Sequence, residues 1–236
     1  MQLLEVHDVT KKFFGAIAVK NCTLKVEEKT IRGLIGPNGA GKTTLLNMIS
    51  GFYKPDEGEI YFKNKRIDGL RPHQIAKIGI ARTFQVSKPF RQMTLMDNLI
   101  AAGITHFEKR EELESKAIEL LKFFDLYHLK DEFGENISGG QKKLLEMARV
   151  LTFEPDLIML DEPFHGIHPG FKTKIIKAVR KLSEEGKTFI LISHDIPSIS
   201  ETCDKVSVLC AGELIAEGTP EEIRVDPTVC EAYLGV

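Results

Sequence analysis

The feature that most constrains the fold of this chain is a glycine-rich loop that fits the pattern G-x-x-x-x-G-K-[ST]. The loop consists of Gly36, Pro37, Asn38, Gly39, Ala40, Gly41, Lys42, Thr43 and Thr44. The apolar run at residues 31–35 predicts a buried strand before it, and residues 43–50 predict a helix that stops at Gly51. A strand, a glycine loop and a helix N-terminus in this order form a cradle of backbone N–H groups for phosphate. The pattern therefore predicts a nucleoside triphosphate site.

Two side chains of this loop are expected to act on the phosphates directly. Lys42 would neutralise the terminal phosphates, and the Thr43 hydroxyl would ligate Mg²⁺. The alternative is a glycine-rich turn that matches the pattern by chance. Both glycines, the Lys-Thr pair and the flanking strand and helix patterns are present together, which favours the phosphate site.

Composition limits the kinds of partner. The chain has 236 residues and a formal net charge of −2, which argues against a broad polyanion-binding surface, so no nucleic acid partner is expected. The cysteines form no C-x-x-C pair and are expected to be free thiols; they are Cys22, Cys203, Cys210 and Cys230. The N-terminus shows no secretory pattern and the longest apolar runs have the length of strands. These features predict a cytosolic protein that reaches a membrane only through a partner.

The order of predicted elements indicates an α/β core interrupted by helices. Predicted strands occupy residues 3–9, 18–26, 31–35, 59–62, 66–67, 80–84, 157–160, 188–193 and 206–209. Between residues 86 and 153 the pattern is helical instead, with apolar positions at helical spacing from Leu113 to Phe124. After Pro155 strands alternate with helices, which implies a parallel sheet covered on both faces.

The expected fold is thus a mostly parallel core sheet with an N-terminal antiparallel β subdomain and an inserted helical subdomain. We expect a single domain over residues 1–236. Its parts would be a nucleotide-binding core with the β subdomain at 1–85 and 154–215, a helical subdomain at 86–153 and a C-terminal helical tail at 216–236.

A second candidate anion site opens another predicted helix at Ser138, Gly139, Gly140 and Gln141. Ser138 and Gln141 have the spacing of a capping box. Each glycine in the first turn costs about 1 kcal/mol of helix stability relative to alanine, but a bare backbone lets an anion approach the helix N-terminus. Alone, this pattern is more often structural; beside a phosphate loop, it favours a second phosphate contact.

Together these motifs resemble the ATP-binding cassette (ABC) ATPases, and the resemblance covers essentially the whole chain. Ser138 to Gln141 resembles the family's signature motif. The apolar strand ending at Asp161 and Glu162 resembles its Walker B strand. Five motifs in the family's order are far more specific than any one alone. The resemblance implies ATP hydrolysis with Mg²⁺ as cofactor.

The resemblance also assigns roles to single residues. Asp161 would hold Mg²⁺, together with Thr43 and Gln85, and Glu162 would act as general base on the attacking water. His194 resembles the switch histidine that contacts the γ-phosphate, and Gln85 resembles the Q-loop glutamine that senses metal and water. Phe13 stands where the family places an aromatic residue that stacks on adenine, although a core role for Phe13 is the alternative.

In this family the two phosphate-contacting motifs belong to different subunits. By resemblance, residues 138–141 of one protomer close over the ATP held by residues 36–44 of the other, in a head-to-tail dimer. The sequence departs from the family after Pro163, where His168 occupies the position of a common aspartate. A histidine supplies no fixed negative charge there, which puts the usual contact across the dimer in doubt.

Further segments resemble the ATPases of branched-chain amino acid importers. These segments are residues 79–85, 93–99, 217–223 and 231–235. The implied partners are membrane permease subunits, a second ATPase subunit and an extracytoplasmic substrate-binding protein, at the cytoplasmic face of the membrane. Residues 83–93 and the helix from Thr94 would contact the permease, with apolar contacts from Phe84, Val86, Pro89, Phe90 and Met93. The alternative is that these residues pack the insert against the core.

Three other functions remain open from sequence. A lipopolysaccharide-export ATPase shares a similar tail. A soluble P-loop GTPase or kinase is a different class; its guanine motif fails at Ile67, after Asn64, Lys65 and Arg66, and the signature helix would go unexplained. A non-transport ABC protein of translation or repair would generally carry two cassettes or a long coiled-coil insert.

Overall fold

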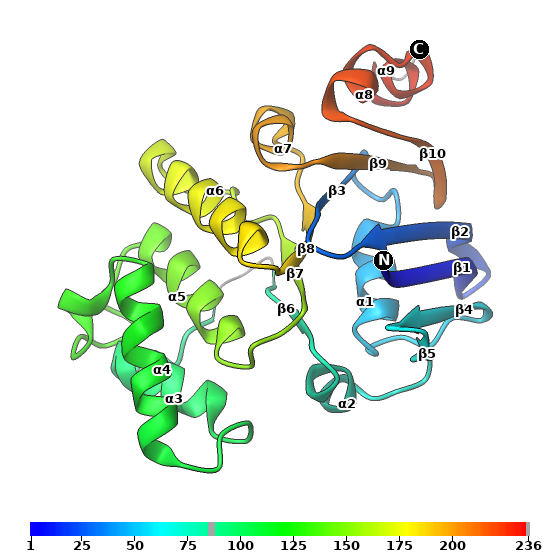
Figure 1. Cartoon of the computed structure of the whole chain (residues 1–236). Coiled ribbons are helices and arrows are strands. Elements are labelled where there is room, and N and C mark those ends of the chain that lie inside the picture. Colours follow the sequence, from blue (N-terminus) through cyan, green and yellow to red (C-terminus); the bar gives the residue numbers. More distant parts are fainter. Residues whose placement is uncertain (85–87, 235–236) are drawn as a thin grey trace.

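The computed structural model describes residues 1–84 and 88–234, which form two sheets and a helical subdomain (Figure 1). An antiparallel sheet has the strand order β2-β1-β4-β5, and a mostly parallel sheet has the order β10-β9-β3-β8-β7-β6. The strands are β1 Gln2–Phe13, β2 Ala16–Glu27, β3 Ile31–Ile35, β4 Glu57–Phe62, β5 Lys65–Arg66, β6 Ile80–Arg82, β7 Leu157–Asp161, β8 Thr188–Ile192, β9 Lys205–Cys210 and β10 Glu213–Gly218. The expected α/β class is confirmed.

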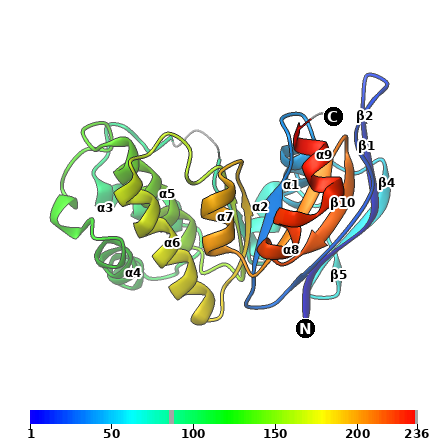
Figure 2. The same ribbon diagram turned by 90° about the horizontal axis from the view of Figure 1, so that it is seen from above.

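Helices cover the core sheet and build the insert. They are α1 Lys42–Ile49, α2 Pro72–Lys77, α3 Leu95–Gly103, α4 Arg110–Phe123, η1 Tyr127–Leu129, α5 Gly139–Leu151, α6 Pro169–Glu184, α7 Ile196–Thr202, α8 Pro220–Val225 and α9 Pro227–Leu234. Seen from above, α3 to α5 lie at one end of the molecule and the antiparallel sheet at the other (Figure 2). α6 and α7 lie between them.

The centre of the core sheet consists of strands buried on both faces. Every residue of β3, β7 and β8 is buried, because helices cover a parallel sheet on both sides. β3 pairs in parallel with β8, and β8 with β7, so their carboxyl ends meet at one edge. Ligands of open α/β sheets bind outside that edge. The phosphate loop and the Asp161-Glu162 pair follow two of these strands there.

The helical insert has its own apolar face. Leu113, Ala117, Leu120 and Leu121 of α4 are buried against the other helices, as the spacing predicted. Thr94 begins α3 and accepts a hydrogen bond from the Asp97 amide. These contacts hold α3, α4 and α5 together as a subdomain, and α5 packs against α6.

The structure corrects several expected boundaries. The strand expected at 80–84 ends at Arg82, and β10 was not expected at all. Because β10 extends to Gly218, helix begins in the tail at Pro220 rather than at residue 216. None of the β10 residues is buried, and among the described strands β10 pairs with β9 alone, which is why its apolar pattern is weak. Two residues of the expected sites, Gln85 and Val86, lie outside the described residues.

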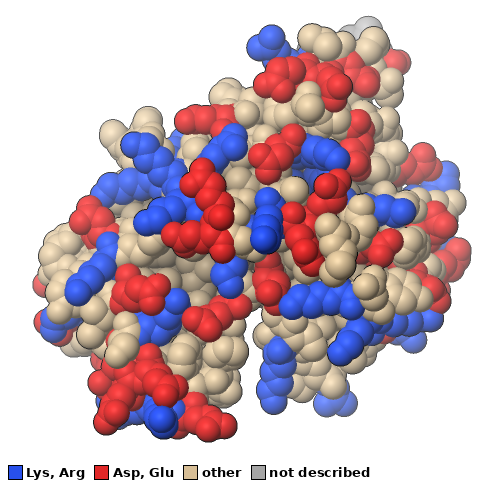
Figure 3. All heavy atoms as spheres, viewed as in Figure 1, with Lys and Arg blue, Asp and Glu red and all other residues tan. Residues whose placement is uncertain are grey.

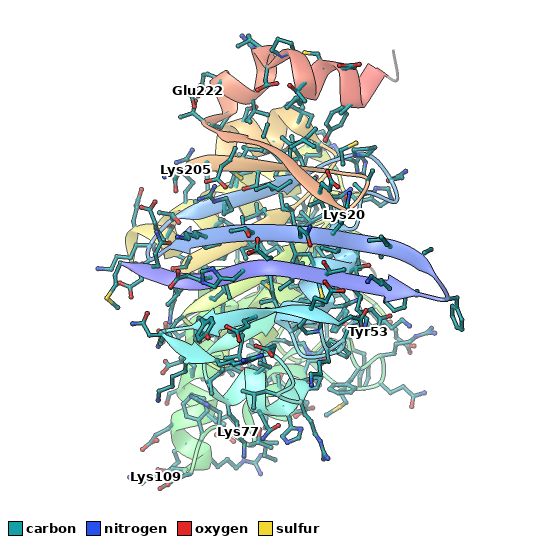
Figure 4. The ribbon with its side chains drawn as sticks, turned by 90° about the vertical axis from the view of Figure 1, so that its right-hand side faces the viewer. Lys20, Tyr53, Lys77, Lys109, Lys205 and Glu222 are labelled. Carbon is teal, nitrogen blue, oxygen red and sulfur yellow. The ribbon has the colours of Figure 1, made fainter. Side chains whose placement is uncertain are left out.

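The surface carries both charges. Figure 3 shows Lys and Arg interspersed with Asp and Glu over the visible face. Figure 4 looks onto the antiparallel sheet, where Lys20 of β2 lies beside β10 and pairs with Glu213 at 2.6 Å. Within residues 1–84 and 88–234, no helix combines the length and apolarity that a membrane crossing requires.

Candidate nucleotide-binding and catalytic site

The phosphate loop is shaped by close backbone contacts. A Cβ on Gly36 would lie 2.0 Å from the Leu209 carbonyl oxygen, and one on Gly41 would lie 2.3 Å from the Ala18 carbonyl oxygen. Gly41 also has a φ of 103°, a left-handed conformation that favours glycine. These two positions fix the turn from β3 into α1, so the first amides of α1 face the space above the sheet.

Lys42 begins α1 and turns back over the loop. Its Nζ donates to the carbonyl oxygens of Gly36 at 2.7 Å and Pro37 at 2.9 Å. Burial lowers the pKa of Lys42, and the nearby carboxylates of Glu162 and Asp161 oppose that shift. An ammonium group held by two carbonyl oxygens is available to exchange them for phosphate oxygens.

Asp161 ends β7 in a buried position. Its backbone N–H donates to the Thr83 hydroxyl at 3.2 Å. Its carboxylate Oδ2 accepts from Arg82 Nη2 at 2.8 Å, and both side chains are almost fully buried. The carboxylate is therefore held at the sheet edge beside the phosphate loop.

Glu162 follows in a left-handed conformation with a φ of 51°. Its backbone N–H donates to the Ile192 carbonyl oxygen at 2.8 Å, and its carboxylate Oε2 accepts from the Ser193 hydroxyl at 3.3 Å. His194 Nδ1 lies 3.0 Å from the same oxygen. Positive φ in a residue other than glycine costs free energy and occurs where the surrounding structure imposes it. The β8 end thus holds the Glu162 carboxylate against His194.

These residues share one cavity. A cavity of about 230 Å³ is lined by Ala18, residues 38–44, Asp161, Glu162 and Ile192. It brings together the loop and the two carboxylates, as the sequence predicted. His194 does not line the cavity but contacts Glu162, which does. Phe13 and residues 138–141 do not line it either.

The cavity offers oxygen donors suited to Mg²⁺. The Thr43 hydroxyl and the Asp161 carboxylate both line it, and Mg²⁺ is usually held by one or two protein oxygens together with phosphates and waters. Among the described residues no group of three His, Cys, Asp or Glu could hold a metal alone. The donor set therefore fits Mg²⁺ that arrives with a nucleotide.

The signature segment is a capped helix start elsewhere on the surface. The Ser138 hydroxyl accepts from the Gln141 amide at 3.3 Å, and the Gln141 side chain accepts from the Ser138 amide at 2.8 Å. A Cβ on Gly139 would meet nothing within 4 Å, whereas one on Gly140 would lie 2.4 Å from the Phe171 ring. The predicted capping box is confirmed, and Gly139 is exposed.

Phe13 ends β1 in a half-buried position. Its ring meets that of Tyr53 edge to face at 5.1 Å, and Lys11 Nζ lies 5.6 Å from its centroid. Tyr53 is labelled in Figure 4, near β4. The adenine contact of Phe13 stays a prediction, with Tyr53 as a neighbour that sequence reasoning missed.

His168 has a local structural role. Its Nδ1 accepts a hydrogen bond from the Gly170 amide at 3.2 Å and so caps α6, which has Pro169 in its first turn. Aspartate is a common N-cap residue, so histidine here replaces one acceptor by another. The cap requires an unprotonated Nδ1.

Arg82 and Ser193 are the other contributors that sequence reasoning missed. Ser193 carries no signal beyond its place before His194. Arg82 carries one, since a charged residue in a short strand beside β7 needs a buried partner of opposite charge.

Comparison with known proteins agrees with this geometry. A family profile described as ABC transporter matches residues 19–165, and one described as branched-chain amino acid ATP-binding cassette transporter matches residues 213–236. The chain is 37% identical to the probable branched-chain amino acid transport ATP-binding protein LivG of Archaeoglobus fulgidus, covering 100% of this chain and 96% of that protein. It is 38% identical to the high-affinity branched-chain amino acid transport ATP-binding protein BraF of Pseudomonas aeruginosa, covering 99% and 98%.

Solved structures are similar as well. The ADP conformation of an ATP-binding cassette of an ABC transporter superposes with a TM-score of 0.93 at 36% identity, covering 100% of both chains. A dimeric post-hydrolysis cassette bound to ADP and Pi has a TM-score of 0.84 at 29% identity, covering 92% of this chain and 99% of that one.

Proposed function

This chain belongs to the ABC transporter ATP-binding proteins of the branched-chain amino acid group, and on that premise we propose how its residues perform ATP hydrolysis for transport. It is the ATP-binding subunit of a branched-chain amino acid importer. The observation that carries the proposal is the single cavity in which the phosphate loop faces Asp161 and Glu162, with His194 Nδ1 at 3.0 Å from the Glu162 carboxylate.

The loop binds and orients the triphosphate. The α1 amides and the Lys42 ammonium offset its negative charge, and Lys42 exchanges the Gly36 and Pro37 carbonyl oxygens for phosphate oxygens. Thr43 and Asp161 would hold Mg²⁺, with Gln85 as a further ligand. That ion would supply positive charge to offset the negative charge that develops on the phosphates.

Glu162 is the general base. Its carboxylate accepts the proton of the attacking water, while His194 and Ser193 hold the carboxylate in place from β8. His194 contacts the γ-phosphate and aligns the water with it. The strained backbone of Glu162 keeps the carboxylate at the cavity wall.

Adenine stacks on Phe13, which Tyr53 supports from the side. Ser138, Gly139, Gly140 and Gln141 contact the ATP of a second ATPase subunit. The support is their absence from this chain's own phosphate cavity, together with the open side of Gly139. ATP then joins two subunits, and its hydrolysis separates them.

The partners are permease subunits, a second ATPase subunit and an extracytoplasmic substrate-binding protein, and the subunit lies at the cytoplasmic face of the membrane. The exposed side chains of Phe84 and Phe90 support a permease contact beside the insert. A lipopolysaccharide exporter is less favoured, because the C-terminal profile match is to branched-chain amino acid cassette transporters.

Reconstitution in vesicles tests this function. The purified subunit with its co-purified membrane partners should hydrolyse ATP faster when the binding protein and leucine, isoleucine or valine are added. Lys42→Ala should bind ATP at least tenfold more weakly by calorimetry, since it removes the ammonium group from a partly buried phosphate site. Stimulation by a lipid instead of the amino acids would contradict the importer, and unchanged ATP affinity would contradict the cradle.

A further inference from the structure

Arg82 lies outside the phosphate cavity, and both terminal nitrogens of its guanidinium group are hydrogen-bonded, whereas its buried Nε finds no hydrogen-bond partner among the described residues. Its side chain, at the end of β6, is only 5% exposed. Nη2 donates to Asp161 Oδ2 at 2.8 Å, and Nη1 donates to Asn47 Oδ1 at 2.6 Å and to Ser50 Oγ at 3.3 Å. One guanidinium group therefore connects the end of β7 with α1, the helix that begins at the phosphate loop.

Besides pairing charges, the guanidinium group fixes the relative position of its partners. Arginine presents its donors in a rigid planar fork, so one side chain can fix two partners at a set distance. Asn47 and Ser50 hold the Nη1 end of the guanidinium group. Nη2, at a fixed distance from Nη1, then fixes the Asp161 carboxylate. Buried ion pairs are weak contributors to stability, which makes geometry the more informative consequence of this one.

The contact leaves one carboxylate oxygen for a cation. Arg82 occupies Oδ2 of Asp161, and among the described residues no hydrogen bond to Oδ1 is found. The Thr83 hydroxyl holds the Asp161 backbone from the same β6 end. The carboxylate is thus oriented by β6 before any metal arrives.

Arg82 also lies next to the start of the Q-loop. Its guanidinium carbon is 5.2 Å from the centroid of the Phe84 ring. The Phe84 amide donates to the Glu146 carboxylate at 3.0 Å, and Glu146 lies on α5, the helix that starts at the signature segment. The residue that orients Asp161 therefore packs against the segment that joins the core to the helical insert.

We propose that Arg82 is a positioning residue for metal binding, which fixes Asp161 to α1 so that the carboxylate meets Mg²⁺ in the geometry the phosphates require. This inference rests on the proposed function of the same site. Residues that orient metal ligands typically change metal affinity by roughly ten- to a hundredfold when they are replaced.

Metal binding can be measured apart from turnover. The probe is Mn²⁺ in place of Mg²⁺, titrated into the complex with a non-hydrolysable ATP analogue and followed by electron paramagnetic resonance. Arg82→Gln should weaken Mn²⁺ binding roughly tenfold. Arg82→Lys should weaken it less, since an ammonium group still pairs with Asp161 but cannot reach Asn47 as well. Nucleotide affinity in EDTA should stay within about twofold of the native protein, because Arg82 does not line the phosphate cavity.

Two further variants complete the experiment. Asn47→Ala removes only the α1 end of the fork and should weaken Mn²⁺ binding about threefold, which tests the inference even if Arg82→Gln does not fold. Arg66→Gln is the matched control, because Arg66 also pairs with an aspartate, Asp68, but is half exposed and does not line the phosphate cavity. It should leave Mn²⁺ affinity unchanged.

The outcomes separate the two claims. Native Mn²⁺ affinity in both Arg82→Lys and Asn47→Ala would overturn the positioning role. A native protein that binds the nucleotide without binding Mn²⁺ would instead contradict the proposed metal site. Weaker Mn²⁺ binding with unchanged affinity for the nucleotide in EDTA would support the inference.

Discussion

At the scale of single residues, the site depends on Glu162 being held in an unfavourable backbone conformation. A φ of 51° in a glutamate is tolerated here because β8 supplies partners for both its amide and its carboxylate. The same contacts place His194 Nδ1 against the carboxylate. The strained backbone and the proposed catalytic geometry thus have one cause, the packing of β7 against β8.

Glu162→Gln tests the role of the base. Glutamine keeps the size of the side chain and can still bond Ser193, but it cannot accept the proton of the attacking water. We expect hydrolysis to fall by a factor of about 100 or more, with ATP affinity retained. Single-turnover kinetics and calorimetry measure the two effects. A variant that hydrolyses ATP at the native rate would rule out Glu162 as the base.

The same variant should accumulate a dimer with ATP, because the bridging nucleotide persists when it is not hydrolysed. Light scattering after gel filtration measures this. Glu221→Gln is a suitable control, since Glu221 is an exposed residue in the first turn of α8, outside the phosphate cavity.

At the scale of elements, α5 and α6 meet where the signature segment begins. Gly140 is buried against the Phe171 ring, whereas neighbouring Gly139 is exposed and open. The second glycine position therefore serves packing inside this chain, whereas the first is exposed, as the proposed contact with the ATP of a second subunit requires. His168 caps α6 just before Phe171, so the segment after Glu162 leads directly to this contact.

Alanine at each glycine should separate the two roles. Gly140→Ala places a methyl group into the Phe171 ring and should lower the free energy of unfolding by about 1–3 kcal/mol. Gly139→Ala meets nothing in the protomer and should leave that free energy unchanged or slightly higher, yet lower the ATPase rate. Urea unfolding and steady-state hydrolysis measure these effects. Full activity in Gly139→Ala would count against a nucleotide contact at this glycine.

The cap of α6 depends on a neutral histidine. Replacing an N-cap residue by alanine costs about 1 kcal/mol, so His168→Ala should destabilise the fold by that amount at neutral pH. His168→Asp should restore the loss, because a carboxylate accepts the same hydrogen bond and interacts favourably with the helix dipole. A His168→Ala variant as stable as the native protein would show that the cap contributes little.

At the scale of the whole molecule, the core protects two of the four thiols. Burial raises the pKa of Cys22 and of Cys203 to about 12, whereas Cys210 is half-buried and Cys230 exposed. The thiolate is the reactive form. Iodoacetamide at pH 8 should therefore modify Cys230 and Cys210 first, and Cys22 and Cys203 only in urea. Mass spectrometry identifies the modified sites, and early modification of Cys22 would contradict its burial.

The direction of the pH effect follows from the same shift. An unperturbed thiol titrates near 9.0, so above that pH the unfolded chain releases protons that the folded chain keeps until about pH 12. These two thiols therefore stabilise the fold fully below pH 9, and their contribution is lost as the pH rises through that window.

The proposed dimer predicts that two inactive variants can restore ATPase activity when they are mixed. A Lys42→Ala protomer lacks a working phosphate loop, and a Ser138→Arg protomer lacks a working signature segment. Mixed together, they can form one intact site, so the mixture should recover up to about a quarter of the native ATPase rate, half of all dimers being mixed and each having one of two sites. Failure of any mixture to exceed the separate variants would contradict the arrangement in trans.

The α/β class, the order of the elements and the residues of the phosphate loop could be predicted from the amino-acid sequence. These features are local, since strand and helix periodicity, glycine spacing and the capping box are written in neighbouring residues. Gly36 to Thr44 and the strand ending at Asp161 and Glu162 could be identified for this reason. The resemblance to the ABC ATPases then linked the motifs and is supported by the fold.

How those residues are held depends on contacts between segments that are apart in the sequence. Arg82 and Asp161 are 79 positions apart, and their contact arises because β6 and β7 are neighbours in the sheet. The Gly140 contact with Phe171 depends likewise on packing between segments that are apart in the sequence. Sequence patterns record which residues face a core, whereas the partner that each residue meets depends on how the elements assemble.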